Sequence, residues 1–182
     1  MVFGGPFLDV DLWIADAQRL LLSLDNGEHM LEHVKQCEAT GVYDKEFDEI
    51  NTIYSENFNN RHKGCNYDRP YMQNPSGSHL IIDGVDVYEY AWGKSEFSCT
   101  GTLQHHSSTK FLADLNVPVI FIPGQYDEGT PEAAFYYASL CKKGLAEVSV
   151  IPGAGHSSCQ ERPEEFSAVL TNFAKRIDNN LN

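Results

Sequence analysis

The sequence has little positive charge and no long apolar run, and both shortages exclude classes of function. Its 182 residues contain 13 Lys and Arg against 26 Asp and Glu, which gives a formal net charge of -13. Such a chain repels phosphate backbones and anionic lipids, so we expect neither nucleic acid nor a membrane as its partner. The apolar runs are also far shorter than the roughly 20 residues that cross a bilayer. With 42% hydrophobic residues, the chain can still fold around a core.

The sequence also lacks the Cys-x-x-Cys spacing of a structural metal site. Its five cysteines are widely scattered, at Cys37, Cys65, Cys99, Cys141 and Cys159. An odd number at such spacing predicts free thiols in a reducing compartment, with neither a disulfide framework nor a bound metal. The first residues show neither the basic stretch nor the cleavable apolar segment of an export signal. These absences predict a cytoplasmic protein, although a segment outside this sequence could carry a signal.

Two predicted strands each end in a loop that presents a side chain suited to acid–base chemistry. The run 117–122 leads into a loop with Asp127, and the run 148–151 leads into a loop with His156. In an open parallel sheet, catalytic groups gather outside the carboxyl ends of the strands. The order acid then histidine is that of α/β-hydrolases, whose serine nucleophile comes earlier on a Gly-x-Ser-x-Gly elbow. No Gly-x-Ser-x-Gly occurs in the sequence, so only two-thirds of a triad is present.

Apolar spacing divides the chain into a helical part and a mixed part. Helices are predicted over 9–24, 27–39 and 44–58, with Asp9 or Asp11 as the first cap and Gly41 as the second stop. An irregular loop over 66–78 and a short helix over 85–92 follow. After Ser95 we expect, in chain order, a short helix over 107–115, a strand over 117–122, a helix over 131–143, a strand over 146–151 and a helix over 163–177. This alternation indicates parallel crossovers and an α/β fold class.

Several segments together resemble the proline iminopeptidase family of α/β-hydrolases, and the resemblance spans nearly the whole chain. They are Trp92–Phe97, Thr100–Leu103, Val117–Val119, Gly124–Pro131 and Gly155–His156. The matched part is the C-terminal half of that fold, from its sixth strand onward. The resemblance implies three parts: a remnant of a core strand at 1–8, a helical cap at 9–94 and a C-terminal α/β core segment at 95–182.

Members of this family are serine aminopeptidases that release N-terminal proline from small peptides without a metal or organic cofactor. By resemblance, Asp127 is the triad acid and His156 the general base. A serine hydroxyl is weakly nucleophilic until an oriented imidazole accepts its proton. Glu96 and Glu128 match two glutamates that hold the free amino group of the substrate, because a buried ammonium needs anionic partners. The implied substrates are small peptides with a free N-terminus.

Other residues depart from the family pattern or have a simpler interpretation. Trp92 and Phe97 are interpreted as core, with the lining of a proline pocket as the alternative. The adjacent His105 and His106 point to different sides of any regular element, so we interpret them as surface residues and not as a metal pair. The segment 3–7 is superficially similar in sequence to the family's oxyanion loop. Because it precedes a cap helix and not a nucleophile strand, we interpret this similarity as coincidence.

Neither a nucleophile nor oxyanion donors can be identified in the sequence. Ser76 and Ser78 are the nearest imitation, but no strand-to-helix elbow surrounds them. We therefore predict that the isolated chain is inactive. A sheet without its first strands has an open edge, which predicts pairing with a separate N-terminal half or self-association, unless the chain is a truncated product.

Two alternatives stay open at this point. One is another α/β-hydrolase that acts on an ester, amide or epoxide, for which the two glutamates would be incidental. The other is a non-catalytic binding or assembly module that keeps the fold without the nucleophile.

Overall fold

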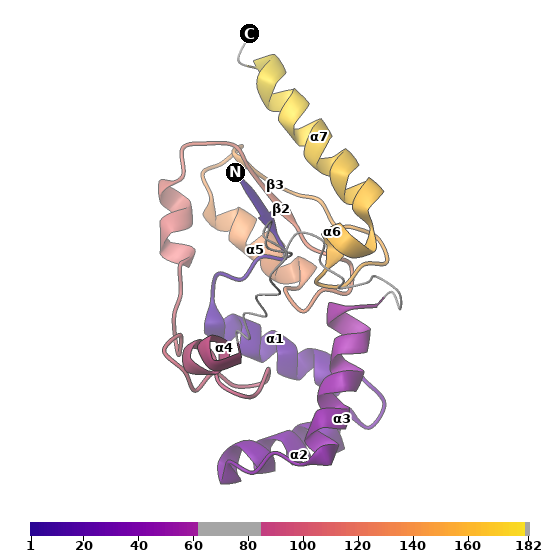
Figure 1. Ribbon diagram of the computed structural model, residues 1–182. Coiled ribbons are helices and arrows are strands. Elements are labelled where there is room, and N and C mark those ends of the chain that lie inside the picture. Colours follow the sequence, from indigo (N-terminus) through magenta and orange to yellow (C-terminus); the bar gives the residue numbers. More distant parts are fainter. Residues whose placement is uncertain (62–84, 181–182) are drawn as a thin grey trace, which may run out of the picture.

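The computed structural model describes residues 1–61 and 85–180, which form a small sheet with helices on both faces and a helical region beside one end of it (Figure 1). The sheet has three strands in the order β1 (Val2–Gly4), β2 (Val119–Ile122) and β3 (Ala146–Val148). Both pairs are parallel, and Phe121 is paired with Phe3 on one side and with Val148 on the other. The start of the chain therefore lies beside strands that come late in the sequence.

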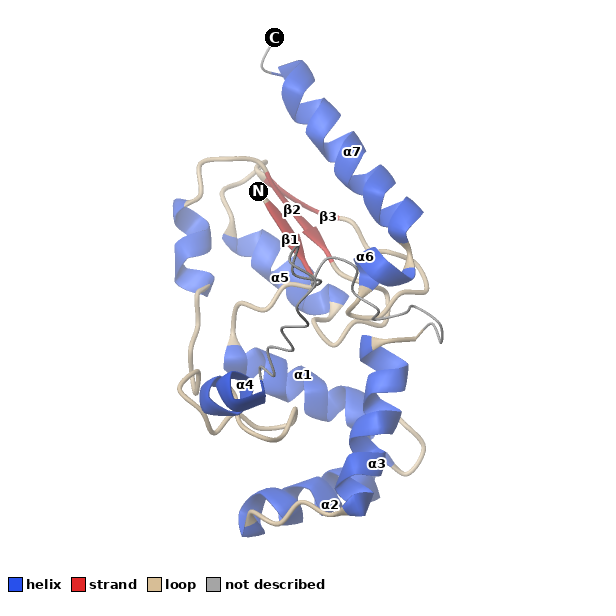
Figure 2. Ribbon diagram, viewed as in Figure 1, coloured by secondary structure: helices blue, strands red, loops and turns tan. Residues whose placement is uncertain are grey.

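Different helices cover the two faces of the sheet (Figure 2). Helix α5 (Pro131–Leu140) packs on the face that carries Val119 and Phe121. Helix α7 (Pro163–Asn180) packs on the face that carries Ile120 and Ile122, mainly through Phe173. All four residues of β2 are buried, as the β-branched run predicts for a strand covered on both faces.

The helical region contains most of the first hundred residues. It is built from α1 (Val10–Leu22), α2 (Gly27–Thr40), α3 (Lys45–Tyr54), the π-helical turn η1 (Ser55–Asn59) and α4 (Val85–Ala91). Its buried core includes Leu21, Val34, Phe47, Ile50 and Phe97. Among the described residues, two further short helices are the 3-10 helix η3 (Thr109–Asp114) and α6 (Ser158–Glu161). No helix among the described residues is both long enough and apolar enough to cross a membrane.

The helix ends follow the capping residues that the sequence suggests. Asp9, and not Asp11, caps α1 by accepting the Leu12 N–H at 2.9 Å. Asp44 caps α3 in the same way through the Phe47 N–H at 3.0 Å. Gly41 ends α2 with a φ of +70, a left-handed conformation that glycine adopts at little cost. The Thr130 hydroxyl caps α5, so the predicted helix start there is confirmed.

Some predicted boundaries differ from the observed ones. The helix predicted over 131–143 ends at Leu140, because Cys141 is extended and a turn closes with Gly144 at a φ of +84. Strand pairing predicted over 146–151 stops at Val148, apart from one bridge between Ile151 and Gly124. The helix expected over 107–115 is a 3-10 helix, and α6 was not predicted. The predicted loop over 66–78, which contains Ser76 and Ser78, lies outside the described residues, and so does Cys65.

Candidate active site

Asp127 and His156 meet beyond the carboxyl ends of β2 and β3. Their side chains are joined by a hydrogen bond of 2.8 Å between His156 Nδ1 and Asp127 Oδ1. The Asp127 side chain is 0% exposed, and it also accepts the N–H groups of Gly129 at 2.7 Å and Gly124 at 3.1 Å. A carboxylate fixed in this way favours the imidazole tautomer with its proton on Nδ1, so that Nε2 is the nitrogen that can accept a proton.

Close backbone contact holds the two loops against each other. A Cβ on Gly124 would lie 2.2 Å from the carbonyl oxygen of Gly155, so only glycine allows this approach. Thr130, which begins α5, donates its hydroxyl to Asp16 Oδ2 at 2.8 Å. Because Asp16 belongs to α1, this hydrogen bond connects the loop of Asp127 to the helical region.

The loop of His156 is held from two further directions. The His156 N–H donates to the Phe58 carbonyl at 2.8 Å, and the Ser157 N–H donates to the Asn59 carbonyl at 3.1 Å. Glu161, at the end of α6, accepts the N–H of Gly155 at 3.2 Å. The π-helical turn η1 and helix α6 therefore set the position of the imidazole together.

Gly5 makes room for the His156 ring. Its φ is +56, and an added Cβ would lie 2.7 Å from His156 Cε1 and 2.9 Å from Nδ1. The Gly5 N–H donates to the Ile122 carbonyl at 3.3 Å. This N–H is therefore used at the end of the sheet, and the structure gives Gly5 a spacing role beside the imidazole.

A cavity of about 360 Å³ opens beside His156. Its wall includes a row of aromatic rings in which Trp92 packs against Phe7 and Phe7 packs against Trp13. The row ends at His156, whose ring centroid lies 5.5 Å from that of Trp13 in an edge-on contact. Trp92 is thus both buried and part of the cavity wall, whereas Phe97 belongs to the core of the helical region.

Glu96 and Glu128 line this same cavity. Glu128 is only 5% exposed, and its buried Oε2 atom has no hydrogen-bond partner in the part of the chain that the structure describes. Burial raises the pKa of the Glu128 carboxyl to about 8, with a smaller opposing effect from His156 and further increases from Glu96 and Asp127. Glu96 Oε1 accepts the hydroxyl of Tyr88 at 2.5 Å.

Opposing effects act on the pKa of His156. Burial lowers this pKa, because it disfavours the charged ring. The hydrogen bond and negative charge of Asp127, together with the charges of Glu128 and Glu96, act in the other direction and leave the pKa above its ordinary value. The carboxyl groups around the ring therefore favour the protonated form of His156.

The four residues predicted from the sequence converge on one site, but the residues around them were missed. Gly5, Trp13, Tyr88 and Glu161 all touch the site or its loops. In the sequence, only the pair Gly4-Gly5 indicated an unusual backbone at Gly5. The helical spacing of Trp13 predicted that its ring is buried, but not that it contacts His156. His105 lies on the surface, 73% exposed, paired with Asp11 at 2.9 Å.

Comparisons with known proteins find relatives of the chain, although no family model matches the sequence. The chain is 32% identical over 180 residues to the proline iminopeptidase of Heyndrickxia coagulans, covering 97% of this chain and 58% of the relative. Identity to the proline iminopeptidase of Lactobacillus helveticus is 25% over 184 residues, covering 98% and 57%. The chain therefore spans just over half the length of the curated relatives that it matches.

Solved structures extend the likeness to the fold. A crystal structure of proline iminopeptidase from Mycobacterium smegmatis matches with a TM-score of 0.76 and 23% identity, over 100% of this chain and 58% of that one. A crystal structure of VinJ matches with a TM-score of 0.78 and 22% identity, over 96% and 56%. The predicted fold class is confirmed as part of an α/β-hydrolase fold. The chain is related to proline iminopeptidases of the α/β-hydrolase fold and corresponds to their C-terminal half.

Proposed function

We propose that the chain is the cap and acid–base half of a serine aminopeptidase that releases N-terminal proline from small peptides. One observation carries the proposal. His156, which is hydrogen-bonded to Asp127, lines the same cavity as Glu96 and Glu128, and the buried Oε2 atom of Glu128 has no hydrogen-bond partner among the described residues. An acid–base pair beside a site for a cation is the arrangement that cleavage next to a free amino group requires.

Each side chain has a role in this proposal. His156 Nε2 removes the proton of a serine hydroxyl as its oxygen attacks the carbonyl carbon of the first residue. Asp127 stabilises the imidazolium, which then gives the proton to the leaving amine. Water, deprotonated by the same imidazole, releases the amino acid and restores the serine. Glu96 and Glu128 hold the substrate ammonium, whose positive charge lowers the pKa of Glu128 so that its proton goes to water, and whose N–H group can donate to Oε2.

The aromatic row gives the site its preference for a ring without charge. Trp13, Phe7 and Trp92 present apolar surface next to His156. A proline side chain fills such a wall without leaving a polar atom unpaired, whereas a charged side chain would lose its hydration there. We therefore assign the aromatic wall to the ring of the first residue and the two glutamates to its nitrogen.

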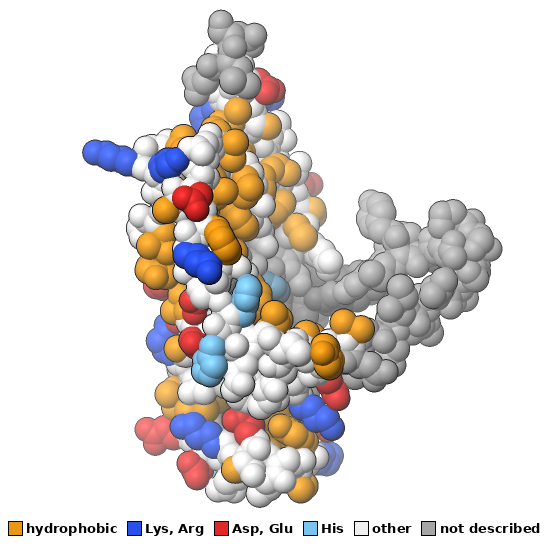
Figure 3. Space-filling view, turned by 90° about the vertical axis from the view of Figure 1, so that its left-hand side faces the viewer, with side chains coloured by type: hydrophobic (Ala, Val, Ile, Leu, Met, Phe, Trp, Pro, Cys, Tyr) orange, Lys and Arg blue, Asp and Glu red, His pale blue; other side chains and the backbone are white. Residues whose placement is uncertain are grey.

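The serine and the oxyanion donors must come from polypeptide beside β1. This strand is one of the two outer strands of the described sheet, next to an apolar groove of about 670 Å³ whose lining includes Val2, Val117, Leu170 and Phe173. Figure 3 views the molecule from the side on which residues 109–114 lie, and hydrophobic side chains gather across the upper part of that face. We propose that an N-terminal half, equivalent to the uncovered part of the relatives, pairs with β1 here.

Complementation with a relative tests this function. The chain would be produced alone and together with the part of the Heyndrickxia coagulans protein that precedes the matched region. We expect hydrolysis of a prolyl arylamide by the complex only, and loss of turnover with the His156→Ala variant. The matched His105→Gln variant alters an exposed histidine and should keep full activity. Acetyl-prolyl arylamide should not be cleaved, because its nitrogen carries no charge.

Each part of the proposal has an outcome that contradicts it. Turnover by the purified chain alone would show that it contains its own nucleophile. Equal cleavage of prolyl and acetyl-prolyl substrates would favour an esterase or amidase in which the glutamates are incidental. A complex that forms without any turnover would favour a binding module. A stable, monodisperse monomer in sedimentation that never binds the N-terminal part would exclude the proposed partner.

A further inference from the structure

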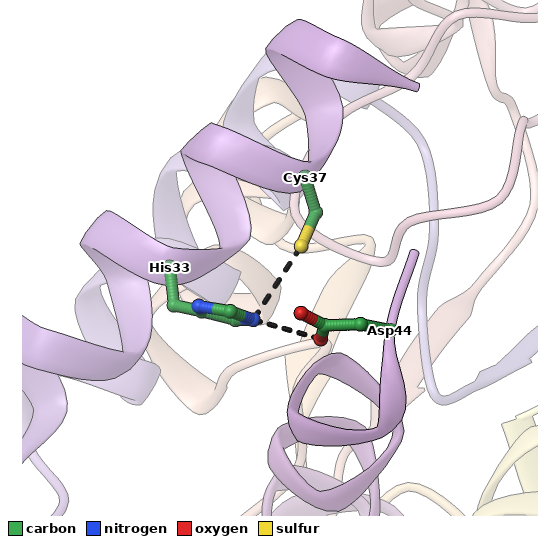
Figure 4. A group of neighbouring side chains, drawn as sticks. All are labelled: His33, Cys37 and Asp44. Atoms are coloured by element: carbon green, nitrogen blue, oxygen red, sulfur yellow. Dashed lines mark hydrogen bonds and ion pairs between the residues drawn. The ribbon is translucent and has the colours of Figure 1, made fainter. Parts of the chain in front are cut away.

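A second cluster of reactive side chains lies in the helical region, away from the cavity. His33 and Cys37 are one turn apart on α2, and Asp44 begins α3 (Figure 4). His33 Nε2 lies 3.5 Å from Cys37 Sγ and 2.9 Å from Asp44 Oδ1. The three atoms that could bind a metal ion, one from each residue, lie within 4.8 Å of one another. They supply one nitrogen, one sulfur and one oxygen to a single point between the two helices.

These separations are close to those around a tetrahedral zinc ion. With Zn–S of about 2.3 Å and Zn–N of about 2.0 Å, tetrahedral angles place sulfur and nitrogen about 3.5 Å apart, and nitrogen and oxygen about 3.3 Å apart. The Sγ to Nε2 distance of 3.5 Å already matches, and the Nε2 to Oδ1 distance of 2.9 Å needs a small opening. Imidazole, thiolate and carboxylate are all ordinary zinc ligands.

The surroundings of the cluster suit a bound cation. The other ring nitrogen of His33, Nδ1, lies 3.7 Å from Glu46 Oε2, and Glu46 Oε1 is 2.9 Å from His29 Nε2. A carboxylate beside the second nitrogen is the usual way in which a metal-binding histidine is oriented. Cys37 is 4% exposed, whereas the Asp44 side chain is 51% exposed, so the cluster has a closed inner side and a side open to water.

The backbone holds the ligands in place without the ion. Gly41 ends α2 in a left-handed turn and so lets α3 return along it. Asp44 Oδ1 accepts the N–H of Phe47, which fixes the carboxylate as the helix cap with the same oxygen facing His33 Nε2. The site is therefore largely formed before binding, and an ion need only replace the hydrogen bond between His33 and Asp44.

We propose that His33, Cys37 and Asp44 form a binding site for a divalent cation of the zinc type, which joins α2 to α3. Binding releases the thiol proton to water, and His33 binds the ion through an unprotonated Nε2 with its single ring proton on Nδ1, toward Glu46. A ring that starts neutral with its proton on Nε2 moves that proton to Nδ1 by exchange with water, and a ring that starts charged releases its Nε2 proton to water. Water occupies the fourth position on the open side. Thiolate and carboxylate together neutralise the two charges of the ion, and the site is independent of the proposed peptidase function.

Metal titration of the full chain tests the site. After treatment with a chelator, the chain would be titrated with zinc chloride in a calorimeter and with cobalt(II) in a spectrophotometer. We expect one tight site, a higher unfolding temperature with zinc, and a thiolate-to-cobalt charge-transfer band with the strong visible absorption of tetrahedral cobalt. Cys37→Ser should abolish the charge-transfer band, and His33→Gln and Asp44→Asn should weaken binding at least tenfold.

Matched variants separate the site from adventitious binding. Asp44→Asn keeps a good helix cap, so its effect reports the lost ligand and not the lost helix. Cys159→Ser removes an exposed thiol, and His105→Gln and Asp11→Asn alter an exposed histidine–carboxylate pair, and all three should bind zinc as the wild type does. Absence of tight binding would overturn the proposal. So would unchanged binding in the Cys37→Ser and His33→Gln variants, or loss of the band in Cys159→Ser alone.

Discussion

Two histidine–carboxylate pairs of nearly equal length lie in two regions of this molecule and are suited to different chemistry. In the core loops, His156 and Asp127 are 2.8 Å apart, and in the helical region His33 and Asp44 are 2.9 Å apart. Asp127 is fully buried with two backbone N–H donors, whereas the Asp44 side chain is half exposed. The distance alone therefore does not decide the role of such a pair.

What differs is the surroundings of each imidazole. His156 lines a cavity with two further carboxyls and an aromatic wall, which suits a ring that moves protons. His33 has the sulfur of Cys37 at 3.5 Å from the nitrogen that also meets Asp44, which suits a ring that shares a cation with its neighbours. The chemical role of a histidine–carboxylate pair is therefore indicated better by the third group near the imidazole than by the pair itself.

The largest expected effect comes from removing the charge of Asp127. Asp127→Asn should lower turnover by the complex about 10⁴-fold, because the amide no longer fixes the tautomer or stabilises the imidazolium. In the chain alone, it should lower the pKa of His156, since the hydrogen bond and the charge that raise this pKa are lost. Titration of the histidine signals by nuclear magnetic resonance measures the pKa, and arylamide hydrolysis measures turnover.

The exposed pair of Asp11 and His105 is the control for this change. Asp11→Asn removes the charge from a pair of similar length, 2.9 Å, whose side chains are 63% and 73% exposed. Turnover should stay at the wild-type level. An unchanged pKa of His156 in Asp127→Asn would remove the basis for calling the buried pair an acid–base unit.

The next largest effect should come from a methyl group at Gly5. Gly5→Ala places a Cβ 2.7 Å from His156 Cε1, so the ring must shift. We expect turnover by the complex to fall about 100-fold, because a displacement on the order of 1 Å at the base disrupts proton transfer. Crowding and the left-handed backbone should also lower the free energy of unfolding by about 1–3 kcal/mol, measured by denaturant titration.

The Gly41→Ala variant distinguishes the effect of backbone strain from the effect of steric crowding in Gly5→Ala. Gly41 has a similar φ of +70, but a Cβ there would meet nothing within 4 Å. This variant should lose about 1 kcal/mol of stability through strain and retain turnover. If both variants lose the same stability and neither loses turnover, the spacing role of Gly5 is wrong.

A pH-dependent effect is expected from Glu128. Its carboxyl has a pKa of about 8 in the folded chain against an ordinary value of 4.5, so the folded state binds more protons between these values. Stability from this group is fully present below pH 4.5 and is lost as the pH rises toward 8. Glu128→Gln cannot ionise, and it should match the wild type below pH 4.5 and become more stable than it by about 1.4 kcal/mol for each pH unit between 4.5 and 8.

Thermal or denaturant unfolding between pH 4 and pH 9 measures this difference. The exposed Glu89→Gln variant on α4 is the control, and its difference from the wild type should change little across the range. A difference for Glu128→Gln that is also independent of pH would show that burial does not raise the pKa of the Glu128 carboxyl.

The smallest effect should follow from Thr130→Ala. The change removes the cap of α5 and the hydroxyl that donates to Asp16, at an expected cost of about 1–2 kcal/mol in unfolding free energy. Thr52→Ala on α3 removes an exposed hydroxyl that donates to the Asp48 carbonyl, and it should cost less than about 0.5 kcal/mol. Equal losses of unfolding free energy in denaturant titrations would show that the hydrogen bond from Thr130 to Asp16 does not stabilise the fold.

Local signals in the sequence were enough to predict most of the elements. The helical spacing around Trp13, the cap at Asp9 and the stop at Gly41 depend on neighbouring residues, and each is found in the structure. The same holds for β2, whose continuous apolar run indicated burial on both faces. Convergence of Asp127 and His156 followed from one general property of parallel sheets, that their strand ends meet at one edge.

Long-range contacts explain what the sequence did not reveal. Gly5 faces His156 only because β1 pairs with β2, and no local pattern predicts that pairing. The spacing of His33 and Cys37 was visible as one helix face, but their approach to Asp44 depends on the turn at Gly41. The double role of Trp92, in the core and in the cavity wall, depends on Phe7 reaching it from the start of the chain.

The junction between η1 and the histidine loop consists of main-chain hydrogen bonds, from His156 to Phe58 and from Ser157 to Asn59. On the η1 side only backbone carbonyls take part, so these two bonds do not depend on the side chains of residues 58 and 59. On the other side Gly155 is required, because a Cβ there would lie 2.5 Å from the Phe58 carbonyl oxygen. The residues of η1 can therefore change without loss of these bonds, provided that the last turn before residue 60 keeps its shape and residue 155 stays glycine.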